Sequence, residues 1–249
     1  MVHGAFCGGW VFDAFRGPFE RAGHEVVAPD LPGHEPDSRP GAVAGLSMSD
    51  YARAVADVCG AQARPPILVG HSLGGLVAQM AAARTRVEGL ILLAPSAPWG
   101  VPGGSLEEAV SAVSLYALGP FWSLAVDPDY MLARRYTFDR LPRAQRREMF
   151  DRMTAESGRA LFETLNWWLD PFATTIVPAS GVNSRALALA GGRDAIHPPA
   201  TVRETARRIG ADVQVFPHMS HWLPGEPGWQ DVAQACLAWI ERRSALSAA

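Results

Sequence analysis

The stretch PILVGHSLGGLVAQMAAA, residues 66–83, decides the fold. It begins with a short run of apolar residues that ends at Gly70, which is typical of a strand buried on both faces of a sheet. Residues 70–74 then match the pattern G-x-S-x-G, and an apolar helix pattern follows directly. This order of strand, sharp turn and helix predicts a strained turn that exposes the Ser72 hydroxyl at the carboxyl end of the strand.

Further apolar runs of the same kind recur along the chain, with helical patterns between them. Strands that alternate with helices imply a parallel sheet with right-handed crossovers, covered by helices on both faces. We therefore predict an α/β fold with an open, doubly wound and mostly parallel sheet. The further strands are expected in EVVAP (25–29), GLILLAP (89–95), ALALAGG (186–192) and DVQVFP (212–217), and the helices over 49–59, 73–83, 199–208 and 229–242.

One long stretch, residues 97–182, breaks the alternation. It contains no convincing strand, and a helical insertion between two sheet strands is expected to lie over the strand ends. We therefore divide the chain into an α/β core of residues 1–96 and 183–249 and a helical cap of residues 97–182. Most aromatic side chains of the cap should pack among themselves, and a few are expected to line a pocket below it. The candidate cap helices cover 106–118, 130–136, 142–157 and 158–169.

Composition excludes several kinds of function. A net charge of -3 offers no electrostatic footprint for nucleic acid or an anionic membrane. All 22 basic residues are Arg, which excludes Schiff-base chemistry, pyridoxal phosphate enzymes and P-loop or protein kinases. Three widely spaced cysteines and the absence of a metal-ligand motif predict no disulfide, metal or cofactor. Without a membrane-spanning run or a secretory signal, we expect a soluble cytoplasmic protein.

A serine hydroxyl is a weak nucleophile at neutral pH, so Ser72 requires a general base and a carboxylate that orients the base. Asp194 follows one predicted strand, and His218 and His221 lie on the loop after the last one. The carboxyl ends of parallel strands meet at one edge, so these residues are expected near Ser72. The chain order Ser, Asp, His at strand ends is that of a catalytic triad on such a sheet.

Five stretches, which span nearly the whole chain apart from the insertion, carry a resemblance to a known family. They are HGAFCGGW (3–10), APDLPGHEPDS (28–38), VGHSLGG (69–75), LAGGRDAIHPP (189–199) and SHWLPGEPGW (220–229). In these stretches the chain resembles the α/β-hydrolase superfamily, and most closely the branch of small esterases and hydroxynitrile lyases that includes plant methyl-salicylate esterase. The resemblance implies Asp194 as the acid and His221 as the base, with His218 as the alternative.

Acyl transfer also needs N–H donors for the oxyanion that develops on the substrate. The turn after Ser72 provides the N–H of Leu73, and the resemblance implies Ala5 as the second donor, with Phe6 as its alternative. Because only two residues precede His3, we expect about six strands rather than the family's eight.

The resemblance also narrows the chemistry. Ser72 replaces the aspartate nucleophile of haloalkane dehalogenases and epoxide hydrolases, and Ala5 and Trp222 replace the threonine and lysine of hydroxynitrile lyases.

The expected function is a cofactor-independent serine hydrolase that cleaves a small to medium hydrophobic carboxylic ester through an acyl-enzyme. Lactonase activity, for example on acyl-homoserine lactones, thioesterase activity, C–C bond hydrolysis and a non-catalytic ligand receptor are the alternatives, and a homodimer is left open. The expected substrate contacts are Phe6, Trp122, Trp167 and Trp222.

Overall fold

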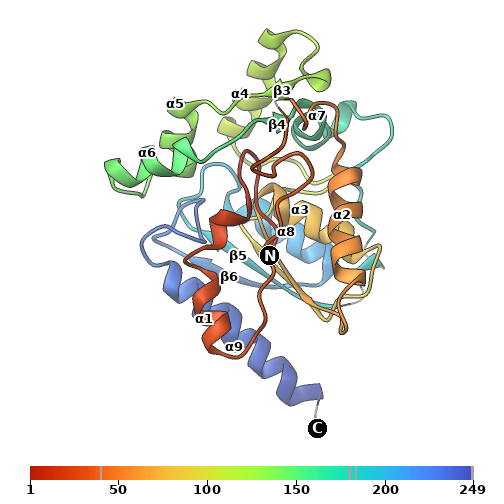
Figure 1. Cartoon of the computed structure of the whole chain (residues 1–249), viewed down its shortest axis with the longest axis vertical. Helices are drawn as coiled ribbons and strands as arrows, with labels where there is room; N and C mark the ends of the chain where they lie inside the picture. Colours follow the sequence, from red (N-terminus) through yellow and green to blue (C-terminus); the bar gives the residue numbers. More distant parts are fainter. Residues whose placement is uncertain (40, 179–180, 183, 248–249) are drawn as a thin grey trace.

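A computed structural model of the chain describes residues 1–39, 41–178, 181–182 and 184–247 (Figure 1). At its centre, the described residues form a parallel sheet of four strands in the order β1-β2-β5-β6. The strands are β1 (Ile67–His71), β2 (Gly89–Leu93), β5 (Arg185–Gly191) and β6 (Asp212–Phe216). The α/β fold with a parallel sheet is therefore confirmed.

The sheet has fewer strands than the six that we expected from the sequence. Residues 25–29 form no strand, although the Met1 amino group donates a hydrogen bond to the Val27 carbonyl at 2.5 Å. Val2 makes a single parallel bridge to Gly70 of β1. Among the described residues, β1 has no further partner on this side, and residues 25–29 have no regular strand to pair with.

Helices cover both faces of the sheet, as predicted. The last four residues of β2 are fully buried: Leu90 and Leu92 join the core on one face, and Ile91 and Leu93 join the core on the other. Burial on both sides explains why this run shows no polar alternation. The first face is covered by α2 (Met48–Gly60), α3 (Leu73–Ala82) and α8 (Pro199–Ile209), and the second by α1 (Arg16–Arg21) and α9 (Trp229–Ser247).

Helix α2 begins earlier than the sequence pattern suggested. The sequence pattern predicted a start at residue 49, but the N-cap is Ser47, whose hydroxyl accepts a hydrogen bond from the Ser49 N–H at 3.1 Å. The Asp50 carboxylate in turn accepts one from the Ser47 N–H at 2.9 Å. These two bonds form a capping box, which the spacing of Ser47 and Asp50 encodes.

The chain between β2 and β5 lies above the core, at the top of Figure 1. We call residues 97–182 the cap segment; its predicted end adjoins Asn183, which is outside the described residues. A short antiparallel ladder of β3 and β4 corrects the expectation that the insertion has no strand. The elements are α4 (Leu106–Ser114), β3 (Ala125–Val126), α5 (Tyr130–Leu132), α6 (Arg143–Asp151), β4 (Glu156–Ser157) and α7 (Gly158–Leu165).

Short helical turns complete the secondary structure of the described residues. Among the described residues, no helix is both long and apolar enough to cross a membrane. The turns are η1 (Gly9–Phe12), η2 (Leu115–Leu118), η3 (Phe121–Ser123), η4 (Ala133–Thr137) and η5 (Trp167–Leu169).

Candidate active site

Ser72 lies on a strained turn between β1 and α3, as the sequence predicted. Its backbone φ is +54°, in the left-handed region that residues other than glycine seldom adopt. Glycines on either side make room for this turn: a β-carbon on Gly70 would collide with the Gly74 carbonyl, and one on Gly74 would collide with the His3 carbonyl. The turn therefore depends on both glycines.

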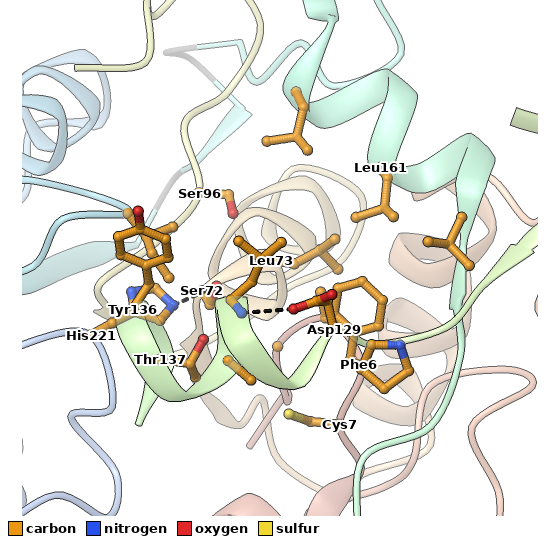
Figure 2. A pocket seen from close by; sticks show the side chains of 18 of the residues that line it. Phe6, Cys7, Ser72, Leu73, Ser96, Asp129, Tyr136, Thr137, Leu161 and His221 are labelled. Carbon is orange, nitrogen blue, oxygen red and sulfur yellow. Dashed lines mark hydrogen bonds between the residues drawn. The ribbon is translucent and has the colours of Figure 1, made fainter. Parts of the chain in front are cut away.

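The structure brings Ser72, His221 and Asp194 together from the loops after β1, β6 and β5. Ser72 Oγ lies 3.0 Å from His221 Nε2 (Figure 2), and His221 Nδ1 lies 2.9 Å from Asp194 Oδ2. An ionised carboxylate can only accept, so Nδ1 carries the ring proton and Nε2 is free to accept the Ser72 proton. The alternative base, His218, is exposed and is not among the described residues that line the cavity above Ser72.

Asp194 is held as a carboxylate. Its Oδ1 accepts hydrogen bonds from the N–H groups of Ile196 at 2.8 Å and His197 at 2.9 Å, while Oδ2 faces His221. Burial raises the pKa of Asp194, but the adjacent His221 ring and these hydrogen bonds outweigh that effect and hold the pKa below its usual range. The group is therefore ionised at neutral pH.

Two further buried histidines flank His221. The His71 ring lies 5.0 Å from the His221 ring, and its Nε2 donates to the His221 carbonyl at 2.9 Å. His197, which lies just before α8, has its ring buried 5.1 Å from that of His221, and its Nδ1 donates to the Ala94 carbonyl at 3.1 Å. Burial lowers the pKa of His71 to about 3 and that of His197 to about 4, so both rings are neutral.

One group of potential metal ligands is present in the described part of the chain. Asp194, His197 and His221 each offer one ligand atom, and these atoms lie within 4.8 Å of one another. All three side chains already take part in the hydrogen bonds given above.

The two predicted oxyanion donors are available. Ala5 and Leu73 line the cavity beside Ser72, and their N–H groups donate to no group in the described residues. The alternative donor, Phe6, gives its N–H to Glu156 Oε2 at 3.2 Å. The structure therefore leaves Ala5, rather than Phe6, with a free N–H at this position.

A cavity of about 430 Å³ lies between Ser72 and the cap segment. Phe6 and Trp222 line it, as predicted, whereas Trp122 and Trp167 are not among the described residues that do. Aromatic rings of the cap segment hold these two side chains elsewhere: Trp122 packs on Phe121 and Phe162, and Trp167 on Trp99 and Trp168. The wall that the cap segment adds is largely aliphatic: Leu115, Leu118, Val126, Leu132, Leu161 and Leu165.

Glu108 is a cavity residue that the sequence did not reveal. Its place in the first turn of α4 is typical of a solvated helix start, yet it lines the cavity and its Oε2 is buried without a hydrogen-bond partner in the described structure. Burial, together with the negative charge of Asp194, raises the pKa of Glu108 to about 7. The carboxyl group is thus partly neutral at neutral pH.

The variant Glu108→Gln is expected to be more stable than the wild type at alkaline pH. In the unfolded chain the carboxyl loses its proton near pH 4.5, but in the folded chain only near pH 7. The wild type therefore loses stability as the pH rises from 4.5 to 7, while the neutral amide does not. We expect the gain in Tm to grow over this range and to stay constant above it. A rise of the pKa from 4.5 to about 7 corresponds to about 3 kcal/mol, or roughly 6–12 °C in a domain of this size.

Thermal unfolding at pH 4.5, 7 and 8.5 measures this effect. The exposed residue Glu148 on α6 provides the matched control: Glu148→Gln should show no gain that grows with pH. A gain in Tm of Glu108→Gln that is the same at pH 4.5 and 8.5 would contradict the prediction.

The fold and the arrangement of Ser72, Asp194 and His221 define a class of protein, and a comparison with family models agrees with it. Residues 1–235 match the model of the alpha/beta hydrolase family. The chain belongs to this family.

Individual proteins are also similar to this chain in sequence or in structure. A pyrethroid hydrolase of Sphingobium wenxiniae is 41% identical over 75 residues, a stretch that covers 30% of this chain and only 26% of that protein. The solved structure of a pyrethroid hydrolase from Sphingobium faniae is 24% identical, with a TM-score of 0.69 and coverage of 96% of this chain and 95% of that one. The methylesterase MES16 from Arabidopsis is 18% identical, with a TM-score of 0.67 and 98% coverage of both chains. At these identities the structures show a shared fold.

Proposed function

We propose that this protein hydrolyses carboxylic esters, with Ser72 as the nucleophile. The observation that carries the proposal is the continuous chain of hydrogen bonds from Ser72 Oγ through His221 to Asp194. In the first half of the reaction Ser72 Oγ attacks the ester carbonyl carbon while His221 Nε2 takes the hydroxyl proton. Asp194 stabilises the imidazolium that forms, and His221 then returns the proton to the departing alkoxide.

The second half removes the acyl group. Water attacks the carbonyl carbon of the acyl group on Ser72 while His221 takes a proton from that water. The bond from this carbon to Ser72 Oγ then breaks, His221 returns the proton to Ser72 Oγ, and the carboxylic acid leaves. Each tetrahedral intermediate carries a negative oxygen. The free N–H groups of Ala5 and Leu73 are the proposed donors to this oxygen.

The cavity favours a neutral, small to medium hydrophobic ester. Its walls are mainly aliphatic and aromatic, and no arginine is among the described residues that line it. Glu108 and Asp127 both lie on the wall, so a substrate carboxylate would find negative charge and no cation there. The relatives named as a pyrethroid hydrolase and a methylesterase support an ester as the substrate class.

A fluorophosphonate probe tests the proposal on the intact protein. Covalent labelling that peptide mass spectrometry assigns to Ser72, together with turnover of p-nitrophenyl butyrate, is the expected result. The p-nitrophenyl monoester of glutaric acid, which carries a free carboxylate, should be a poorer substrate by roughly tenfold or more. Folded protein that neither takes up the probe nor hydrolyses the butyrate would refute the proposal and favour the receptor alternative.

A further inference from the structure

The loop that carries Ala5 is held by the cap segment. Phe6, the next residue, has a backbone φ of +63°, which is unusual for a side chain of this size. Its N–H donates to Glu156 Oε2 at 3.2 Å, and its carbonyl accepts from the Thr154 N–H at 2.9 Å. Both backbone groups of this left-handed residue are therefore fixed by one short stretch of the cap segment, about 150 residues away in sequence.

Glu156 is fully buried and anchored on several sides. In addition to the bond from the Phe6 N–H, its carboxylate accepts hydrogen bonds from the Tyr51 hydroxyl and from the Ser157 N–H, both at 2.7 Å. His34 Nε2 lies 3.3 Å from Glu156 Oε2. Burial raises the pKa of Glu156, but the His34 ring and these hydrogen bonds outweigh that effect and lower it, so the side chain is a carboxylate. Its negative charge in turn raises the pKa of His34 against the effect of burial.

The same loop is fixed at its other end by the core. His3 Nε2 accepts from the Leu31 N–H at 2.8 Å, and its Nδ1 donates to the Gly4 carbonyl at 2.9 Å. Gly4 lies so close to Ser72 that a β-carbon added to it would be 3.0 Å from the Ser72 Cβ. Ala5 thus lies between two anchored residues, beside the proposed nucleophile, and its N–H is free.

We propose that Glu156 is a positioning residue for the oxyanion site: by holding the Phe6 N–H, it fixes the peptide that presents the Ala5 N–H next to Ser72. This inference rests on the proposed function, in which an oxyanion forms at Ser72. It assigns to the cap segment a part in the chemical step as well as in enclosing the cavity. A shift of about 1 Å in such a donor costs on the order of 100-fold in rate.

The variant Glu156→Ala tests the inference, because it removes the acceptor of the Phe6 N–H. We expect kcat for p-nitrophenyl butyrate to fall by roughly 10- to 100-fold, with KM changed less than threefold. An alkyl trifluoromethyl ketone forms an oxyanion adduct with an active serine, and its affinity should fall by the same factor as kcat. The alcohol with the same chain forms no adduct and should keep its affinity.

Glu163 provides a matched control for loss of stability. It is also a buried carboxylate of the cap segment, and it accepts hydrogen bonds from the Ser47 hydroxyl and the Met48 N–H of the core. It makes no hydrogen bond to the loop of residues 3–7 in the described structure. Glu163→Ala should lower Tm as Glu156→Ala does, but leave kcat and the affinity for the ketone within threefold of the wild type.

A second variant, Glu156→Gln, covers the case in which the alanine variant does not fold. Its single oxygen can serve either Phe6 or the pair of Tyr51 and Ser157, so we expect a smaller loss of ketone affinity, roughly fivefold. A folded Glu156 variant with kcat and ketone affinity within twofold of the wild type would overturn the inference, as would an equal loss in Glu163→Ala. If wild-type Ser72 takes up neither the fluorophosphonate nor the ketone, the proposed function itself fails.

Discussion

Replacing Ser72 with alanine is expected to lower kcat for p-nitrophenyl butyrate by roughly 10⁶-fold. The substitution removes the oxygen that forms the acyl bond in the proposed reaction, while alanine fits the same turn because Gly70 and Gly74 still leave room for it. The hydroxyl makes one side-chain hydrogen bond, to His221, so Tm should change little. Steady-state kinetics and fluorophosphonate labelling measure the effect, and labelling should disappear.

Ser96 is the appropriate control for this variant. It lines the same cavity and its hydroxyl lies 3.3 Å from the Nε2 of a buried histidine, His197. Ser96→Ala should keep labelling at Ser72 and retain kcat within about tenfold. If Ser72→Ala remained active and Ser96→Ala did not, the nucleophile would have been assigned to the wrong serine.

The variant Asp194→Asn is expected to lower kcat by about 10⁴-fold with little change in structure. Oδ1 of Asp194 accepts two backbone N–H bonds, from Ile196 and His197. The amide oxygen of asparagine will take that place, which turns the NH₂ group toward His221 Nδ1. The ring must then carry its proton on Nε2, where it can no longer accept the proton of Ser72.

Asp212 serves as the control for Asp194→Asn. This residue is exposed at the start of β6, and its carboxylate accepts a hydrogen bond from the Trp239 indole N–H at 3.4 Å. Asp212→Asn should leave kcat within about twofold of the wild type. An Asp194→Asn variant that kept more than a tenth of the wild-type kcat would show that another group orients His221.

Most of the core fold could be predicted because local pattern and tertiary burial agree there. The apolar runs of β1, β2 and β5 are almost wholly buried, so each was visible in the sequence. The edge strand β6 is more exposed, but its apolar residues Val213, Val215 and Phe216 still made it recognisable. The run at residues 25–29 has the same composition but forms no strand, because a strand also needs a partner of sufficient length. Composition reports the propensity of a segment, and pairing depends on the rest of the chain.

The candidate site, like the fold, could be predicted only in part. Ser72, Asp194 and His221 were found because each follows a strand, and the carboxyl ends of parallel strands share one edge. The contact between Glu156 and Phe6 was not found, since it joins distant residues through a backbone N–H and leaves no motif in the sequence. Trp122 and Trp167 were wrongly placed at the cavity because an aromatic residue packs as readily on another ring as on a ligand.

The bonds from Thr154 and Glu156 to Phe6 bear on how this protein could be re-engineered. Exchanging the insertion for that of another hydrolase is an obvious way to change which molecules are accepted. A chimera in which residues 97–182 come from another hydrolase would also lose both bonds to Phe6. It would keep them only if the new segment placed a hydrogen-bond acceptor and an N–H at the same two positions. Selectivity and turnover would then change together, and grafts should be designed with residues 154–156 retained.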